Sequence, residues 1–263
     1  MSLNMHPSSF KICIIGSGNV AHFMGKKLLH SQHQVVQIIS PNIEHARKLA
    51  EVLNCDYADI ISKINPIVDV VILAINDDAI KKIAPNDLLK NKIVIHTAGS
   101  VSLEDIQHLS PRTACIWPVY SISKNNLPSS DKIPLAVNFS INEIKDPLMN
   151  MAHSMSSNVF ILNDEQKMIA HVSAVFANNF SNHLFAIAEK LLDKQHIPFD
   201  ILMPLIKNTV EKLNTHSPAD NQTGPAIRKD EKTIQKHVNL LTDSDKIIYE
   251  MLTKSIQELA LTK

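Results

Sequence analysis

The first half of the chain alternates short apolar runs with amphipathic stretches. Apolar runs of roughly four to eight residues are typical of strands buried in a parallel sheet. Stretches with apolar residues spaced three and four apart follow some of these runs, as expected for helices. The apolar runs are Phe10–Ile15, Val35–Ile39, Val68–Ile75, Lys92–His96, Ala114–Trp117 and Leu135–Phe139, and the first helical stretches are Val20–Leu29 and Glu44–Leu53.

This alternation predicts an α/β fold with a doubly wound, mostly parallel sheet of the Rossmann type. The second half has only helical patterns. Asn163 and Gln166 can cap a helix reciprocally, and a helix of about thirty residues is expected to follow, to near His196. Later helices are expected over Ile201–Asn214, with Asp200 as its cap, and near Asp230–Leu241 and Asp245–Leu259.

We therefore expect two domains. The first is a Rossmann-like dinucleotide-binding domain over residues 1–157, and the second is an all-helical domain over residues 158–263.

The sharpest local pattern is the stretch KICIIGSGNVAHFMGKKLL, in which an apolar strand runs into Gly16-x-Gly18-x-x-Ala21 and then into a helix. Gly16 permits a tight turn, Gly18 lets a pyrophosphate approach the backbone, and Ala21 allows close packing of helix and strand. Free amides at the helix start attract the pyrophosphate charge. We predict that a dinucleotide binds at Gly16, Ser17, Gly18, Asn19 and Val20. The alternative is a purely structural turn.

The next predicted strand ends in QIISPN. Proteins that bind NAD usually have Asp or Glu there to hold the ribose hydroxyls, and a carboxylate would repel a 2′-phosphate. Ser40 and Asn42 occupy this region, with Arg47 and Lys48 further on. We predict that Ser40 and Asn42 contact the cofactor, which the missing carboxylate indicates to be NADP, with NAD as the alternative.

Three loops leave predicted strands at the edge of the sheet where ligands bind in open α/β folds. Asp78 is expected to cap the helix that follows the first of these loops. A structural role is an alternative for each polar residue of the loops. Cofactor contacts are predicted for Ala74, Ile75, Asn76 and Thr97, and substrate contacts for His96, Ser100 and Tyr120.

The stretch AVFANNFSNHLFAIAEKLL places amides and an imidazole in a predicted helix. At 100° per residue from Phe176, Asn179 and His183 lie within the apolar stripe, and Asn182 flanks it. An unpartnered buried polar group costs about 1–3 kcal/mol. We predict that His183 donates or accepts a proton and that Asn179 orients the substrate, with Asn182 nearby. The alternative is a satisfied polar cluster at a helix or subunit interface.

A second polar cluster, NQTGPAIRKD, contributes Gln222, Thr223 and Arg228 as predicted substrate contacts. Arg228 can bind a carboxylate or phosphate through two parallel hydrogen bonds. Alternatively, Arg228 pairs with Asp230 at a helix start.

The charge balance is even, since Lys plus Arg and Asp plus Glu both number 26. We therefore expect a small-molecule substrate and neither nucleic acid nor membrane as partner. The histidines have no metal-binding spacing, and no metal site is expected. The unpaired Cys13, Cys55 and Cys115 are expected to be small buried hydrophobes in a reducing compartment. With a short polar N-terminus and no membrane-length apolar run, they suggest a cytoplasmic protein.

The stretches IIGSGNVA, HTAGS, VFANNFSNHL and QTGPAIRKDEKTIQKH resemble a family of bacterial NADP oxidoreductases. Those proteins join a Rossmann-like domain to a helical domain of unassigned function. Wider relatives include pyrroline-5-carboxylate reductase, ketopantoate reductase and prephenate dehydrogenase, whose helical domain is similar to that of 6-phosphogluconate dehydrogenase. The family often has Ser-Arg-Thr after the second strand, where this chain has Ser40-Pro41-Asn42.

The resemblance implies a homodimer formed through the helical domain and a cleft lined by His96, Ser100, Asn179, His183 and the Gln222–Arg228 loop. Together with the glycine turn, it predicts an oxidoreductase that transfers a hydride between a nicotinamide cofactor and a small carbonyl, imine or hydroxy acid. The alternatives are a sensor that binds a dinucleotide without catalysis and a deazaflavin-dependent reductase.

Overall fold

The structure is a computed structural model that describes residues 9–261. The chain divides into two compact units, Met1–Asn178 and Asn179–Lys263. The boundary expected after residue 157 lies just before a strand that pairs within the sheet, so the first unit continues past it. The domain limits 1–157 and 158–263 remain a prediction.

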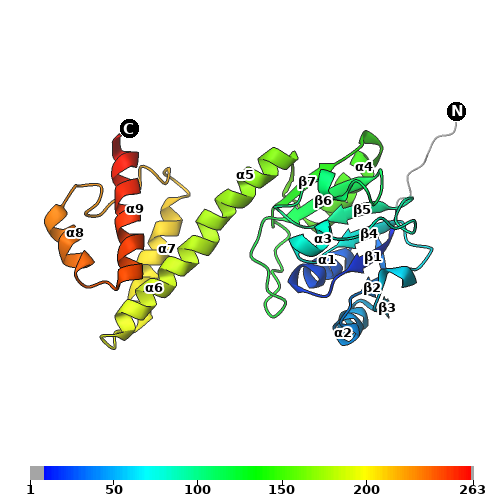
Figure 1. Ribbon diagram of the computed structural model, residues 1–263, viewed down its shortest axis with the longest axis horizontal. Coiled ribbons are helices and arrows are strands. Elements are labelled where there is room, and N and C mark those ends of the chain that lie inside the picture. Colours follow the sequence, from blue (N-terminus) through cyan, green and yellow to red (C-terminus); the bar gives the residue numbers. More distant parts are fainter. Residues whose placement is uncertain (1–8, 262–263) are drawn as a thin grey trace. The chain divides into compact units, whose positions relative to one another are not determined.

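The first unit is built on an eight-stranded sheet (Figure 1) with the order β3-β2-β1-β4-β5-β6-β7-β8. The pairs from β3 to β6 are parallel, β7 is antiparallel to β6, and β8 is parallel to β7. The strands are β1 Lys11–Ile15, β2 Gln34–Ile39, β3 Asp56–Ala58, β4 Val70–Leu73, β5 Ile93–His96, β6 Thr113–Pro118, β7 Leu135–Phe139 and β8 Val159–Ile161.

The strand order reverses between β1 and β4, which pair in parallel from Ile12↔Val70 to Ile15↔Leu73. To one side of β1 the chain builds β2 and β3, and to the other it builds β4, β5 and β6. Ligands of open α/β sheets bind at such a reversal, beyond the carboxyl ends of the strands. The predicted Rossmann-type sheet is confirmed. Its strand order reverses beside the turn of Gly16 and Gly18 that follows β1, which we call the glycine turn.

Both faces of the sheet are covered, because its strands alternate apolar side chains between two cores. Ile12 and Ile14 of β1 belong to a core that also contains Phe23, Leu49 and Met151. These three come from α1 (Asn19–Leu29), α2 (Ile43–Leu53) and α4 (Lys145–Met155), and α1 contacts both other helices. Cys13 and Ile15 point into the opposite core.

The opposite face is covered by short elements and connecting loops. They are the helix α3 (Asp77–Lys81) and the 3-10 turns η1 (Ile61–Lys63) and η2 (Glu104–Ile106). Ile80 and Ile106 are fully buried there. A further 3-10 turn, η3 (Asn142–Ile144), precedes α4.

Helix α5 (Asp164–Ala174) begins in the first unit. Its predicted capping box is confirmed: the Asn163 side chain accepts from the Gln166 amide at 2.8 Å, and the Gln166 side chain accepts from the Asn163 amide at 3.0 Å. Ala170 packs against Cys115 and Trp117 of β6 and Ala136 of β7. The first turns of α5 therefore pack against strands β6 and β7 of the sheet.

Beyond α5 the chain stays helical through a π-helical segment, Val175–Phe180, into α6 (Ser181–Asp193). The expected helix to near His196 is thus largely confirmed, but its predicted regularity is wrong. A π-turn closes i→i+5 hydrogen bonds and contains an extra residue. The 100° wheel drawn from Phe176 therefore does not hold for Asn179 or His183, and both side chains are exposed.

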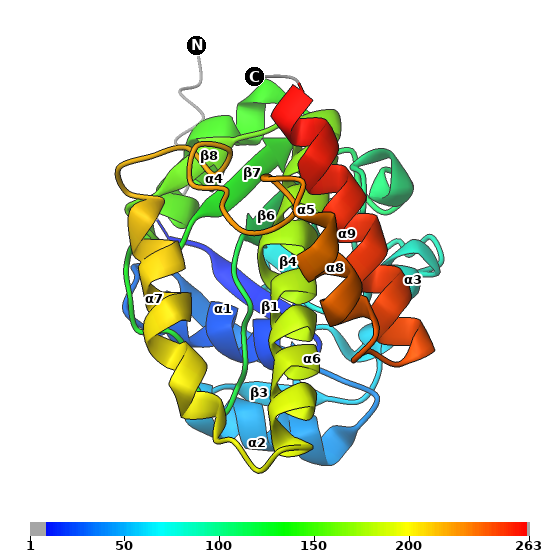
Figure 2. The ribbon, with the colours of Figure 1, turned by 90° about the vertical axis from the view of Figure 1, so that its left-hand side faces the viewer.

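The second unit continues with helices whose order matches the sequence pattern (Figure 2). α8 and α9 contact each other. The prediction that Asp200 caps a helix is wrong, because Asp200 lies inside a 3-10 turn that leads into α7. The elements are η5 Phe199–Leu202, α7 Met203–Lys212, α8 Glu231–Val238 and α9 Asp243–Leu261.

The cysteines are all free, as expected. Cys13 and Cys115 are fully buried, while Cys55 is partly buried. Burial raises the pKa of the Cys13 and Cys115 thiols to about 12. Both behave as small apolar side chains of the core.

Candidate functional site

The turn after β1 is formed where Gly16 passes close to the end of β4. Gly16 has φ +123°, and a Cβ atom there would lie 2.1 Å from the carbonyl oxygen of Ala74. The backbone is fixed on both sides, because the Gly16 amide donates to Ile39 at 2.8 Å and the Ala74 amide donates to Ile15 at 2.8 Å. Only glycine fits this position.

Gly18 differs from Gly16 because space is open around it. A Cβ atom at Gly18 would meet nothing within 4 Å, and the residue has an extended backbone. Gly18 is the N-cap of α1, and no side chain caps this helix or places an acid in its first turn. The first amides of α1 therefore face open space with the positive end of the helix dipole behind them, an arrangement suited to an anion.

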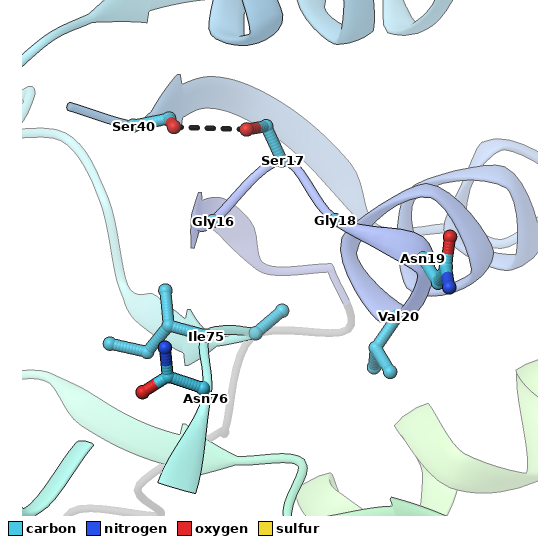
Figure 3. A pocket seen from close by; sticks show the side chains of 9 residues that line it. Gly16, Ser17, Gly18, Asn19, Val20, Ser40, Ile75 and Asn76 are labelled. Atoms are coloured by element: carbon cyan, nitrogen blue, oxygen red, sulfur yellow. Dashed lines mark hydrogen bonds between the residues drawn. The ribbon is translucent and has the colours of Figure 1, made fainter. Parts of the chain in front are cut away.

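A cavity of about 360 Å³ lies at this turn (Figure 3), between the ends of β1, β2 and β4. Two residues that the sequence predicted as cofactor contacts do not line it. Asn42 caps α2 by accepting from the His45 amide at 3.0 Å, and buried Thr97 donates to the carbonyl of Leu73 at 3.3 Å. The lining consists of predicted cofactor residues: Gly16, Ser17, Gly18, Asn19, Val20, Ser40, Ala74, Ile75 and Asn76.

The β2 side of this cavity carries hydroxyl groups. Ser17 and Ser40 are joined by a hydrogen bond of 2.9 Å, which Figure 3 shows, and Ser40 is buried. Arg47 on α2 is held by two carboxylates: it donates to Glu44 at 2.6 Å and also to Glu51. The guanidinium is thus already paired in this structure.

A second cavity, of about 740 Å³, shares Asn76 with the first and also contains Ser100. Ser100 donates a hydrogen bond to Asp77. The prediction that Asp78 caps α3 is wrong, because Asn76 accepts from the Ala79 amide at 2.8 Å and is the cap. Of the predicted substrate residues of the first unit, Ser100 is the one that lines a cavity next to the glycine turn.

His96 and Tyr120 line neither of these two cavities. Tyr120 is exposed in the loop after β6. His96 is fully buried at the end of β5, where Nδ1 accepts from the Ala98 amide at 3.3 Å and Nε2 has no partner among the described residues. His96 is thus a core residue in this structure, and its predicted substrate contact remains a prediction.

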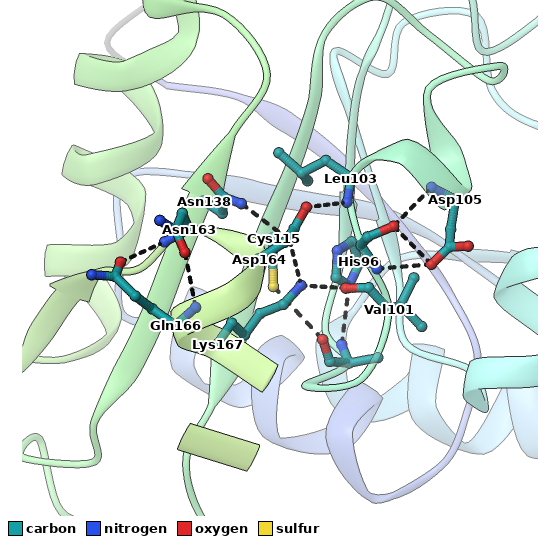
Figure 4. A network of polar contacts seen from close by, with 12 residues as sticks. His96, Val101, Leu103, Asp105, Cys115, Asn138, Asn163, Asp164, Gln166 and Lys167 are labelled. Atoms are coloured by element: carbon teal, nitrogen blue, oxygen red, sulfur yellow. Dashed lines mark hydrogen bonds and ion pairs between the residues drawn. The ribbon is translucent and has the colours of Figure 1, made fainter. Parts of the chain in front are cut away.

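Burial, and secondarily the charge of Lys167, lowers the pKa of His96 to about 3, against the opposing effect of Asp164 and Asp105. The imidazole is therefore neutral in the folded protein at physiological pH. Figure 4 shows this side chain beside a polar network at the start of α5. The network links buried Lys167 to Asp164, Val101, Leu103 and Asn138.

Sequence reasoning missed this network. Asp164 and Lys167 follow the capping residue Asn163, and an acid with a lysine three residues later is an ordinary pattern of exposed helix faces. The periodicity gives no sign that this lysine is only 2% exposed.

The remaining predicted residues belong to the helical unit. Asn179 lies in the π-helical segment, Asn182 and His183 lie in α6, and all three are exposed. Gln222, Thr223 and Arg228 lie in the loop between α7 and α8. Asp230 caps α8 by accepting from the Thr233 amide at 3.1 Å, a different contact from the predicted pair with Arg228. Arg228 itself is exposed.

Residues 9–261 contain neither a helix suited to crossing a membrane nor a cluster of His, Cys, Asp and Glu side chains suited to a metal ion.

We predict that His96 makes the stability of the first unit depend on pH. Its folded pKa lies below the ordinary 6.5, so the unfolded chain binds an additional proton between these values. The stabilisation is complete above pH 6.5 and is lost as the pH falls towards 3, with a slope of at most about 1.4 kcal/mol per pH unit. His96→Asn, which retains an acceptor for the Ala98 amide, is expected to remove this slope.

Urea unfolding at a series of pH values, monitored by the fluorescence of the single tryptophan, Trp117, measures the slope of the unfolding free energy against pH. His153→Asn, on the exposed face of α4, is the control and should retain it. Equal slopes in the wild type and His96→Asn would contradict the prediction.

Two family models match the sequence. The model described as "NADP oxidoreductase coenzyme F420-dependent" matches residues 11–99, and a domain of unknown function, DUF2520, matches residues 134–256. No curated protein matches the chain.

Solved structures match nearly the whole chain. A candidate NADP oxidoreductase from Bacteroides fragilis has 32% identity and a TM-score of 0.85, covering 95% of this chain and 99% of its own. The 1-pyrroline-5-carboxylate reductase of Streptococcus pyogenes has 18% identity and a TM-score of 0.65, covering 96% and 100%. The reductive aminase of Aspergillus terreus, solved with NADPH, has 12% identity and a TM-score of 0.71, covering 95% and 98%.

The similarities to the pyrroline-5-carboxylate reductase and to the reductive aminase concern the fold. The similarity to the Bacteroides fragilis protein extends to the sequence, and with the glycine turn and the two matching models it shows that this chain belongs to the family of NADP oxidoreductases.

Proposed function

We propose that the protein is an NADP-dependent oxidoreductase that transfers a hydride between the nicotinamide ring and a small carbonyl, imine or hydroxy acid. The observation that carries this proposal is the turn of Gly16 and Gly18, which opens the uncapped start of α1 onto a cavity at the reversal of the sheet. The family name and the NADPH bound to the reductive aminase support the choice of cofactor.

The residues of the cavity fit a dinucleotide. The amides after Gly18 would hold the pyrophosphate, and the hydroxyls of Ser17 and Ser40 would face the adenosine ribose on the β2 side. The nicotinamide half then extends over the ends of β4 and β5, towards Asn76 and the cavity that contains Ser100. When bound, the cofactor supplies the hydride chemistry, and the protein supplies binding and orientation.

Two features of the β2 side decide between NADP and NAD. The cavity has no carboxylate that would repel a 2′-phosphate, which favours NADP. Arg47 is paired with Glu44 and Glu51, so the recognition falls to hydroxyls and backbone amides. We therefore propose NADP as the cofactor, with NAD accepted more weakly.

We predict that Gly18→Val folds normally and loses the cofactor. The extended backbone of Gly18 suits valine and its Cβ atom has open space, so the variant should fold, with a small decrease in ligand-free melting temperature because valine is a poorer N-cap than glycine. The added side chain would occupy the position of the pyrophosphate. Calorimetric titration with NADPH is expected to give an affinity lower by at least about tenfold.

Ala84→Val is the matched control, since it also enlarges a small side chain but at an exposed position that lines neither cavity, and it should leave the NADPH affinity unchanged. Titration with NADH and with reduced coenzyme F420 separates the other cofactor choices. Unchanged NADPH affinity in Gly18→Val would exclude this turn as the binding site.

We propose that His183 exchanges the proton that accompanies hydride transfer and that Asn179 orients the substrate. Both belong to the exposed polar groups at and after the π-helical segment, and such segments frequently occur at functional sites. Imidazole is the side chain best suited to proton transfer near neutral pH. Asn182, Gln222, Thr223 and Arg228 remain proposed substrate contacts.

We predict that His183→Ala binds NADPH like the wild type but turns over substrate at least about a hundredfold more slowly. The measurement is NADPH oxidation against a panel of keto acids, aldehydes and imines, starting with the wild type. His216→Ala, an exposed histidine of the α7–α8 loop, is the control. Wild-type turnover in His183→Ala would refute the role of His183.

We also propose that the protein forms a homodimer through its helical unit. In the described part of this unit, the buried hydrophobic side chains are Ala226, Ile234 and Val238, too few for a core. Its helices expose a large apolar surface, of the kind that marks an interface between proteins. A second copy is the occupant that the family resemblance implies. The exposed residues include Ile201, Leu205, Val210, Leu213, Ile247, Met251 and Leu252.

Light scattering after gel filtration is predicted to give twice the chain mass of 29.3 kDa. Leu205→Glu on α7 and Met251→Glu on α9 should each shift the mass towards the monomer, because each would bury a charge at the interface. Ile60→Glu, an exposed site of the first unit, is the control and should remain dimeric. A monomeric wild type would contradict the proposal.

A further inference from the structure

The start of α5 holds a buried charge that the proposed function does not yet use. Lys167 is 2% exposed, and its ammonium group lies 3.0 Å from Asp164 Oδ1 and donates to the carbonyl of Val101. A buried ammonium is costly unless it is paired and hydrogen-bonded. The lysine therefore requires both of these partners to remain in place.

Asp164 is held in turn by neutral donors. Its Oδ2 accepts from the Leu103 amide at 2.9 Å, and its Oδ1 accepts from Asn138 Nδ2 at 3.1 Å. Burial alone would raise the pKa of Asp164, but the hydrogen bonds from Leu103, Lys167 and Asn138 outweigh burial and lower it. The carboxylate is thus charged, and it connects α5 to both a loop and strand β7.

These contacts converge on the loop Thr97–Leu103, between β5 and η2. Lys167 binds the loop at the Val101 carbonyl and Asp164 binds it at the Leu103 amide (Figure 4), so two backbone groups are fixed from one helical turn. A third contact comes one turn further on, where His171 lies so close to Gly99 that a Cβ atom there would be 2.5 Å from the imidazole.

The position of this loop gives the contacts a functional meaning. It leaves the carboxyl end of β5, next but one to β1 in the sheet, and Ser100 within it lines the cavity that shares Asn76 with the glycine-turn cavity. The nicotinamide half of a dinucleotide would extend to this side, while its adenosine half lies on the β2 side. An apolar residue at position 167 could neither donate to the Val101 carbonyl nor pair with Asp164, the carboxylate that accepts from the Leu103 amide.

We propose that Lys167 and Asp164 are positioning residues that hold the loop Thr97–Leu103 in the shape that receives the nicotinamide half of the cofactor. This inference rests on the proposed function. It assigns to the first turn of α5 a role in cofactor binding that is separate from the glycine turn.

The test compares the affinities of two ligands for Lys167→Met and the wild type. NADP⁺ contains both halves of the cofactor, whereas 2′,5′-ADP contains only the adenosine half. Lys167→Met is expected to weaken NADP⁺ binding by at least about tenfold, because a displaced loop no longer matches the ligand, and to leave 2′,5′-ADP binding unchanged. Lys167→Arg, which can keep the charge and the donors, should restore part of the NADP⁺ affinity.

Two further variants serve as controls. Lys63→Met removes an exposed pair with Asp59 in the same unit and should change neither affinity. Asn138→Leu removes one neutral bond to Asp164 without unpairing a charge, and it carries the test if Lys167→Met does not fold. It should reduce NADP⁺ affinity in the same selective way, but less.

Hydrogen–deuterium exchange of the ligand-free protein gives an independent measurement. Lys167→Met should exchange faster in peptides over residues 97–103 and at the wild-type rate over residues 16–20. Equal losses for both ligands, or unchanged NADP⁺ affinity in a folded variant, would overturn the inference. If the wild type itself bound neither ligand, the proposed function would fail, and unchanged exchange over residues 97–103 would overturn the positioning role separately.

Discussion

The site depends on a close approach between two backbones. Gly16 passes the end of β4 at a distance that excludes any Cβ atom. Its amide donates to the Ile39 carbonyl of β2, and the Ala74 amide donates to the Ile15 carbonyl of β1. Because the turn is so tight, α1 starts directly beyond the sheet with its first amides unshielded by a capping side chain. The cavity, the positive end of the helix and the reversal of strand order then coincide, which is the physical basis for binding a pyrophosphate.

The start of α5 serves a second purpose in the same unit. It covers β6 and β7 with Ala170 and ties down the loop after β5 with Lys167 and Asp164. A buried ion pair adds little net stability, since desolvation offsets its attraction. Its value here is geometric: two charged groups fix two backbone groups of a loop that has no regular structure of its own. Beyond this anchored turn, the same helix leads through the π-helical segment to Asn179 and His183.

Local rules predicted much of the first unit, although they misplaced two helix caps, at Asp78 and Asp200. Val70–Leu73 is buried on both faces and was predicted as a strand by its apolar run, and Gly16 and Gly18 were assigned their separate roles by spacing. The helix α4 was missed, although Leu148, Met151, Ala152 and Met155 form a buried stripe, because Pro147 and several polar residues weaken its pattern.

Other features of the site depend on long-range contacts. His96 follows a strand as a binding residue would, and only the packing of α5 and its neighbours places it in the core. Lys167 looks like a surface residue because its partner Val101 lies 66 positions away in the sequence, and Leu103, the partner of Asp164, lies 61 positions away. The π-helical segment has no composition rule, so the wheel that placed Asn179 and His183 could not account for it.

The central claim is that the glycine turn binds the pyrophosphate of a nicotinamide dinucleotide. A crystal structure of the protein grown or soaked with NADP⁺ tests it most directly. We expect pyrophosphate density against the amides that follow Gly18, with the adenosine ribose beside Ser40 and the nicotinamide towards Ser100. Density for NADP⁺ elsewhere on the molecule, with only water at the turn, would contradict it.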